Sequence, residues 1–251
     1  MTIEVRGIKV NYLHFGQGAE TLLILQGWGT NAGLYRALAE HLGQHMQVLL
    51  PELPGFGETP EPQRAWDAGD YADFAEAFLR ALGIRECHLL GHSNGGRIML
   101  KLCSRQQEEF TYRKLVFVDS AGIVPEKSAR QKLRAKCYKL GRALLRPFPK
   151  AMEAWRQKHG SADYRNASPL MRQTLVKLVN EDLRHLMPLV RQPSLLIWGT
   201  EDKDTPLSHG KIFAELLPDA GLVEVPGAGH YSYLEQPAFV YRVLDSYFGV
   251  L

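Results

Sequence analysis

The sequence predicts an α/β fold in which helices flank a mostly parallel sheet of eight strands. Short apolar runs alternate with segments of helical periodicity, which is the pattern of repeated βα units. Several runs, such as 22–25 and 194–198, are apolar throughout, as expected of strands that are covered on both faces. The stretch of about 70 residues between Asp119 and Pro193 has helical periodicity only, which indicates an all-helical insertion after the sixth strand.

The expected strands and helices follow this alternation in order. Strands are expected at residues 2–6, 8–15, 21–26, 46–50, 86–91, 113–119, 193–198 and 221–225. Helices are expected near residues 32–43, 70–83, 94–106, 207–216 and 235–248. Gly7 joins the first two strands as in a hairpin, so the sheet should begin with an antiparallel pair.

Charge sets the middle of the chain apart from the rest. The whole chain has a formal net charge of +3, but residues 124–190 hold 15 Lys or Arg against 5 Asp or Glu. We therefore predict a core domain made of residues 1–123 and 191–251, with residues 124–190 inserted as a helical cap. The basic face of this cap is expected to be a solvated outer surface. Peripheral contact with an anionic membrane surface and steering of acidic substrates are the alternatives.

Helical signals recur within the predicted cap. Ser168-Pro169 is typical of a helix start, because an N-cap serine is followed by proline at the first helical position. Apolar residues recur at helical spacing opposite a basic face, at Leu133, Cys137, Leu140 and Leu144. Six larger side chains either line a pocket beneath the cap or pack inside it: Phe148, Met152, Trp155, Tyr164, Met171 and Met187.

Composition and charge exclude several classes of protein. A hydrophobic content of 45% and a charged content of 23% are ordinary for a soluble globular enzyme. The N-terminal residues alternate as in a strand and lack the layout of a signal peptide, and no apolar run approaches the roughly 18 residues of a membrane span. We expect no nucleic-acid partner, because no recognised motif is present and the net charge is small. The sequence leaves the oligomeric state open.

The cysteines indicate the compartment. Cys87, Cys103 and Cys137 lie far apart, are odd in number and lack the spacing of a metal site. This pattern argues against a disulfide framework and favours a reducing environment. We therefore expect three structural thiols, a cytoplasmic protein and no metal.

The most informative motif is Gly91-His92-Ser93-Asn94-Gly95, which ends an apolar run and leads into a helical pattern. A serine at a sharp strand-to-helix turn is exposed as a nucleophile, and flanking glycines let the strand and the helix approach closely. A G-x-S-x-G motif also arises by chance, so its value depends on what surrounds it.

Three further segments place polar groups where such a serine needs them. Residues 198–202, WGTED, directly follow a strand of buried type and end in Asp202. Residues 227–230, GAGH, form a glycine-rich loop from which His230 can reach back across the sheet. Residues 25–29, LQGWG, form a flexible loop that can aim a backbone N–H at a developing oxyanion. The order along the chain is therefore serine, acid, histidine.

The ordered set LQGWG, PELPGFGET, GHSNGG, WGTEDKDTP and GAGHYSYLEQP resembles the α/β-hydrolase fold superfamily, in the serine branch with a helical cap after the sixth strand. The resemblance runs along almost the whole chain. It implies Ser93 as nucleophile, Asp202 as the orienting acid and His230 as general base. It also implies oxyanion donors at the backbone N–H groups of Trp28 and Asn94, and Trp28 and Tyr231 are candidates for contact with substrate.

The chain departs from the family pattern at two places. Relatives usually begin the oxyanion loop with His-Gly, where this chain has Gln26-Gly27. An amide can replace the imidazole if the side chain only braces the loop, whereas specificity changes if it touches substrate. Glu52 and Thr59 stand where relatives commonly have Asp and Ser, and we interpret both as structural.

Other residues compete for the catalytic roles. Asp119, at the end of the sixth predicted strand, is the alternative acid, because some members of the superfamily carry their acid there. Asp204 is expected to be a solvated neighbour. The other histidines are expected to be structural or solvated, with His92 pointing away from the pocket: His14, His41, His45, His88, His92, His159, His185 and His209.

The predicted chemistry is two-step acyl transfer from a small-molecule ester, and it requires no metal or organic cofactor. Serine at the turn argues against relatives that attack with a carboxylate, such as dehalogenases and epoxide hydrolases. One alternative is carbon–carbon bond hydrolysis of a vinylogous diketone, whose enzymes often have Trp after the histidine, where this chain has Tyr231. A ligand sensor with slow turnover is the other alternative.

Overall fold

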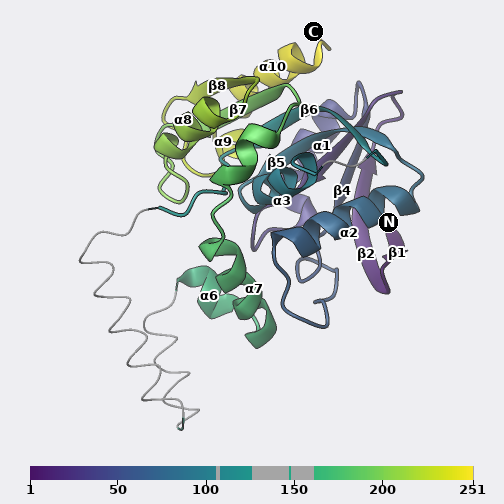
Figure 1. Ribbon diagram of the computed structural model, residues 1–251. Helices are drawn as coiled ribbons and strands as arrows, with labels where there is room; N and C mark the ends of the chain where they lie inside the picture. The colour runs from purple at the N-terminus through teal and green to yellow at the C-terminus, as the bar shows by residue number, and fades with distance from the viewer. Residues whose placement is uncertain (106–107, 126–146, 148–160, 251) are drawn as a thin grey trace.

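An eight-stranded sheet lies at the centre of the computed structural model, which describes residues 1–105, 108–125, 147 and 161–250 (Figure 1). The strands are β1 (Thr2–Val5), β2 (Ile8–Phe15), β3 (Thr21–Leu25), β4 (Gln47–Pro51), β5 (Glu86–His92), β6 (Thr111–Val118), β7 (Ser194–Gly199) and β8 (Ala220–Val225). Their order in the sheet is β1-β2-β4-β3-β5-β6-β7-β8. Strand β2 pairs antiparallel with β1 and β4, and the other neighbouring pairs are parallel. The predicted opening hairpin and mostly parallel sheet are confirmed, and each predicted strand ends within two residues of its expected bounds.

Helices cover both faces of the sheet. The α-helices found in the described ranges are α1 (Arg36–Leu42), α2 (Ala68–Ala81), α3 (Asn94–Cys103), α6 (Ala162–Asn166), α7 (Pro169–Asn180), α8 (Leu207–Leu216), α9 (Ser232–Glu235) and α10 (Pro237–Phe248). Two 3-10 helices are η1 (Ala32–Tyr35) and η2 (Arg184–Leu189). Helices α2, α3 and α8 pack on one face, and α1, α9 and α10 pack on the other (Figure 1).

The apolar strands supply both halves of the core. In β3, Leu23 and Leu25 join the cluster beneath α2 and α3, whereas Leu22 and Ile24 join the cluster beneath α1 and α10. All four side chains are fully buried. Successive side chains of a strand point to opposite faces, so a strand with helices on both sides must be apolar at every position.

Two helices differ from the predicted bounds for local reasons. Helix α2 begins at Ala68, two residues earlier than predicted, because Asp67 and Asp70 form a capping box at its start. The predicted C-terminal helix is divided into α9 and α10 before Pro237. The residue before a proline is driven out of the helical region of the backbone, and Gln236 accordingly has φ −131° and ψ 55°.

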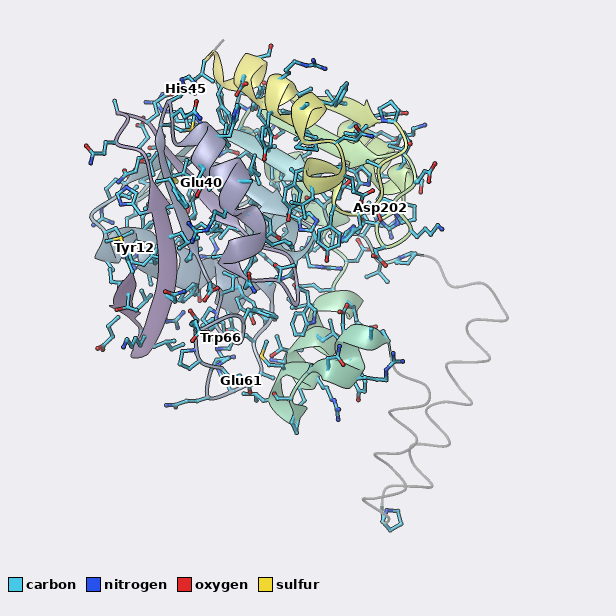
Figure 2. All side chains as sticks on the ribbon, turned by 180° about the vertical axis from the view of Figure 1, so that it is seen from behind. Tyr12, Glu40, His45, Glu61, Trp66 and Asp202 are labelled. Carbon is cyan, nitrogen blue, oxygen red and sulfur yellow. The ribbon has the colours of Figure 1, made fainter. Side chains whose placement is uncertain are left out.

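Helices α6, α7 and η2 lie in the described residues 161–193 that precede β7. The Ser168 side chain accepts a hydrogen bond from the Met171 backbone at 3.1 Å and Pro169 follows, which confirms the predicted helix start. Helix α7 is fixed to the loop before α2, because Thr174 accepts a hydrogen bond from the Trp66 backbone at 3.1 Å. Figure 2 shows Trp66 and Glu61 of this loop beside the green helices α6 and α7. The predicted helical stripe of the cap lies outside the described residues: Leu133, Cys137, Leu140 and Leu144.

Two of the three thiols lie in the described part of the chain. Cys87 in β5 and Cys103 in α3 are buried and form no disulfide, while Cys137 lies outside the described residues. None of the described helices combines the length and the apolar character that crossing a bilayer requires.

The turn from β5 into α3 is made within one residue, Ser93. Its backbone has φ 50° and ψ −112°, which is strained for any residue other than glycine. A Cβ atom at Gly95 would lie 2.0 Å from the backbone oxygen of Leu25, and one at Gly96 would lie 2.2 Å from the Ser120 hydroxyl. Glycine is therefore required here because α3 packs directly against β3.

We expect Gly95→Ala to lower the free energy of unfolding by about 1–3 kcal/mol, because the added methyl group overlaps backbone that cannot move freely. The matched control is Gly221→Ala in β8, where an added Cβ meets no atom within 4 Å. Urea denaturation of both variants measures the difference. Equal midpoints for the two variants would show that the close approach of α3 is not required.

Candidate active site

Three polar side chains meet at the carboxyl end of the parallel strands. The His230 Nε2 atom lies 2.9 Å from the Ser93 hydroxyl, and its Nδ1 atom lies 2.9 Å from the Asp202 carboxylate. Ser93 follows β5, Asp202 lies in the loop after β7 and His230 lies in the loop after β8. Parallel strands end at one edge of a sheet, so residues that lie far apart in the sequence come together there.

The backbone of Ser93 is held by β6 and the segment that follows it. Its N–H donates to the Val118 carbonyl at 3.1 Å, and its own carbonyl accepts from the Ala121 N–H at 2.9 Å. These bonds hold the strained backbone of the turn and leave the hydroxyl facing His230.

Asp202 is held as a carboxylate. Its oxygens accept hydrogen bonds from the Asp204 and Thr205 backbones at 2.8 and 3.0 Å and from the Thr205 hydroxyl at 2.7 Å. Burial alone would raise the pKa of Asp202, but the hydrogen bonds from His230 and Thr205 outweigh it and lower the pKa below its usual value. A carboxylate fixed in this way orients the imidazole.

Asp202 also changes the acidity of His230. Burial alone would lower the pKa of His230, but the hydrogen bond to Asp202 and its negative charge raise the pKa above the usual value. The imidazole is therefore more basic than a free histidine. The arrangement can move a proton from the Ser93 hydroxyl to Nε2 of His230.

Asp119, the alternative acid, contacts the loop that carries His230 but does not contact the imidazole of His230. Its buried carboxylate accepts from the Gly199 N–H at 2.8 Å and from the N–H and hydroxyl of Ser232 at 3.0 and 2.6 Å. Burial raises the pKa of Asp119 to about 7. Asp119 thus ties the ends of β6 and β7 to the loop that carries His230, while Asp202 makes the contact with the imidazole.

The loop after β3 carries one of the two backbone N–H groups that the sequence predicts for an oxyanion site. The backbone N–H of Trp28 has no acceptor among the described residues, and the N–H of Asn94 lies at the first position of α3, where a helix leaves its amides unpaired. Gln26 is fully buried and donates from Nε2 to the Thr30 carbonyl at 2.7 Å. Gln26 therefore braces the loop.

Glu52, like Gln26, holds neighbouring loops in place through hydrogen bonds. Its carboxylate accepts from the Ala32 and Glu58 backbones at 3.1 and 2.7 Å and from the Asn11 amide at 2.9 Å. Thr59 accepts from the Asn11 backbone at 3.0 Å. These contacts confirm the structural interpretation of Glu52 and Thr59.

His92 and Tyr35 connect two of the site loops, which the sequence analysis did not predict. The Nε2 atom of His92 lies 2.8 Å from the His230 carbonyl, and Nδ1 lies 2.9 Å from the Tyr35 hydroxyl. That hydroxyl accepts from the Gly27 N–H at 2.7 Å. His92 was expected to point away from the pocket, but it forms part of the pocket wall. No local signal marks the contact of Tyr35 with His92, because the two residues lie 57 positions apart in the sequence.

A cavity of about 340 Å³ opens above Ser93. Trp28 and Tyr231, the candidates for substrate contact, both line it, as do Leu175 and Leu178 of α7. His209 is buried, which agrees with the structural role that was one of the two expected for it, and it also lines the cavity. Asp204 is exposed at its edge, as expected.

The cap residues proposed for the pocket are placed differently. Tyr164, Met171 and Met187 do not line this cavity, and Met171 lines a second one beside it. Met187 is fully buried and packs in the main core. Phe148, Met152 and Trp155 lie outside the described residues.

Within the described residues, Asp202, Asp204 and His230 are the group whose donor atoms lie close enough together to hold a metal ion, within 4.8 Å of one another. The donor atoms of His230 and Asp202 already bind Ser93, Thr205 and each other. A metal ion there would have to displace these hydrogen bonds.

Comparison with known proteins identifies relatives of this chain. An esterase of pimeloyl-[acyl-carrier protein] methyl ester from Chromobacterium violaceum is 28% identical over 91% of this chain and 94% of its own length. A 2-hydroxy-6-oxo-6-phenylhexa-2,4-dienoate hydrolase from Burkholderia cepacia is 26% identical over 98% and 94%. The crystal structure of an enol-lactonase from Burkholderia xenovorans has the same fold, with a TM-score of 0.77 and 18% identity over 99% of this chain and 100% of that one.

The family model matches nearly the whole chain. Residues 22–243 fit the model described as the alpha/beta hydrolase family. This range runs from β3 into α10 and includes the parallel part of the sheet and all three residues that meet at its edge. The chain therefore belongs to the alpha/beta hydrolase family, and it is a hydrolase.

Proposed function

We propose that the chain hydrolyses carboxylic esters of small molecules through a Ser93–His230–Asp202 triad and an acyl-enzyme. The observation that carries the proposal is the continuous chain of hydrogen bonds from the Ser93 hydroxyl through His230 to Asp202, each 2.9 Å long. Ser93 and His230 line a cavity that is large enough for a small substrate.

The reaction follows from this geometry. His230 takes the proton of Ser93 as the serine oxygen attacks the ester carbonyl carbon. The N–H groups of Trp28 and Asn94 stabilise the resulting oxyanion, and Asp202 stabilises the imidazolium. The tetrahedral intermediate collapses when His230 gives its proton to the leaving alcohol. Water then attacks the acyl-enzyme with His230 again as base, which releases the acid and restores Ser93.

The domain division belongs to the same proposal. Residues 1–123 and 191–251 form the catalytic core, and residues 124–190 form a cap whose helix α7 covers the cavity. The cap then contributes to substrate selection, whereas the reaction depends on the core. We place the enzyme in the cytoplasm, in keeping with its buried, unpaired cysteines Cys87 and Cys103.

Carbon–carbon bond hydrolysis is the second candidate. It is favoured by the 26% identity with the Burkholderia cepacia hydrolase, which is close to the 28% identity with the methyl ester esterase. Tyr231 follows the histidine here, and its position against the cavity makes it the residue at which the two activities would diverge. Parallel assays with a 4-nitrophenyl ester and a vinylogous diketone separate the two, and a slow sensor would turn over neither.

We expect Ser93→Ala to reduce ester hydrolysis by about 10⁴-fold or more, because the nucleophile is removed while the rest of the site stays. Release of 4-nitrophenolate from short-chain esters measures this loss, and a fluorophosphonate probe should label the wild type only. Ser104→Ala, at the other end of α3, is the matched control and should retain activity. Hydrolysis by purified Ser93→Ala at the wild-type rate would rule out the mechanism.

We expect kcat/KM to rise with pH as His230 loses its proton, with a midpoint above the usual histidine value of about 6.5. The sign follows from the raised pKa, which keeps the imidazole protonated, and so unable to act as a base, up to a higher pH. In Asp202→Asn the midpoint should move to lower pH, and kcat should fall by about 10³–10⁴-fold. Asp204→Asn, which removes an exposed neighbouring charge, should cause a smaller shift. An unmoved midpoint in Asp202→Asn would contradict the assignment of the acid.

A further inference from the structure

The cavity above Ser93 is also lined by polar groups that the proposed reaction does not use. They belong to Arg97, His209 and Asn94. Their residues are 6%, 8% and 4% exposed, so all three are more than nine-tenths buried. Buried polar groups are nearly always hydrogen-bonded, so donors without a partner in a cavity wall indicate a ligand.

Arg97 places a positive charge in this wall. Its Nη1 atom donates to the Glu181 carbonyl at 2.8 Å, but it forms no ion pair with any carboxylate in the described part of the chain. The two nearby acids are paired elsewhere, Glu181 with Lys101 at 2.5 Å and Asp182 with Arg184 at 2.8 Å. Burial lowers the pKa of Arg97 to about 10, which still leaves it charged at neutral pH.

His209 and Asn94 complete the wall beside that charge. The Nδ1 atom of His209 and the Nδ2 atom of Asn94 have no hydrogen-bond partner among the described residues, and both atoms are closed off from solvent. Burial lowers the pKa of His209 below its usual value, and the positive charges of Arg184 and Arg97 contribute to the shift. Arg97 is therefore the residue of the three that brings a charge to this wall.

We propose that Arg97 forms a subsite for a carboxylate, so that the preferred substrates are short esters that also carry a free carboxylate. This inference rests on the proposed ester hydrolysis at Ser93. A guanidinium suits a carboxylate because its N–H groups can donate in parallel to both oxygens. A carboxylate bound there would form the direct ion pair that Arg97 does not make within the described residues, where Glu181 and Asp182 act on it only from nearby.

The distance between Ser93 and Arg97 along α3 determines the length of substrate that can reach both residues. Arg97 lies four residues after Ser93, which is about 6 Å along the axis of α3, and side chains on a helix lean towards its N-terminus. An extended carbon chain advances about 1.2 Å per bond. An ester of a four- or five-carbon diacid, or of a hydroxy acid of similar length, can therefore reach both groups.

Two acidic side chains that line the same cavity would repel a bound anion. Asp163 and Asp204 line it, but both are exposed to solvent, where water and salt screen their charge. Arg97 acts from a buried position, where a charge interacts more strongly. We therefore expect Arg97 to dominate the selection of substrates.

The first test uses the wild-type enzyme and two matched pairs of esters. Mono-4-nitrophenyl glutarate is compared with its methyl ester, which differs only in the loss of the free carboxylate, by release of 4-nitrophenolate. 4-Acetoxybutanoate is compared with its methyl ester by release of acetate, which places the anion on the alcohol side. We expect kcat/KM at least about tenfold higher for the anionic member of one pair. Equal rates within both pairs, or preference for the neutral esters, would overturn the inference.

The second test assigns the preference to Arg97. In Arg97→Gln the ratio of anionic to neutral kcat/KM should fall at least about tenfold, mainly through KM, because the charge is lost. Arg97→Lys keeps the charge and should retain part of the preference. Lys211→Gln removes a positive charge from α8, outside the cavity and paired with Glu224, and should keep the wild-type ratio. An unchanged ratio in Arg97→Gln would overturn the subsite.

Failure of the inference and failure of the proposed function can be told apart. If the wild type hydrolyses the neutral esters at the same rate as the anionic ones, ester hydrolysis stands and the subsite is wrong. If it hydrolyses none of the four, ester hydrolysis is wrong, and calorimetric titration with glutarate still tests the subsite. Binding that weakens at least about tenfold in Arg97→Gln supports the subsite, and no binding to the wild type overturns it.

Discussion

The close approach of helix α3 to strand β3 is the constraint on which the site depends. Gly95 leaves no room for a side chain against the Leu25 carbonyl, and this contact forces the chain to turn from β5 into α3 within one residue. Ser93 occupies that residue with a strained backbone, which presents its hydroxyl at the edge of the sheet. The same turn places the unpaired amides at the start of α3, with the positive end of the helix dipole, beside that hydroxyl.

Buried polar side chains on the strands hold the loops around this turn. Asp119 binds the loop that carries His230 and the end of β7, and His92 binds the His230 carbonyl and, through Tyr35, the loop of Trp28. A loop has few packing contacts of its own, so these hydrogen bonds transfer the rigidity of the sheet to it. The geometry of the proposed triad therefore depends on the strand ends as much as on the loops.

Most of the fold, and the meeting of Ser93, His230 and Asp202, could be predicted from the sequence because short local patterns indicate both. Apolar runs with helices between them determine the sheet, and each side chain of the proposed triad lies in a motif of its own that follows a strand. Asp119 and Asp202 both follow parallel strands at the same edge, so position alone could not choose between them. Their hydrogen bonds, to Ser232 and His230, make the distinction. The roles of Tyr35 and Arg97 depend on contacts with residues 57 and 84 positions away, which no local pattern records.

The bridge between His92 and Tyr35 restricts how this site can change over time. Burial lowers the pKa of His92 to about 3, so the ring is neutral and carries a single proton. Because the His230 carbonyl can only accept, that proton resides on Nε2, and Nδ1 must accept from the Tyr35 hydroxyl. A replacement for His92 must therefore donate at one end and accept at the other. Positions 35 and 92 should accordingly vary as a pair during evolution, each tolerating a new residue only when the other supplies the complementary hydrogen-bonding group.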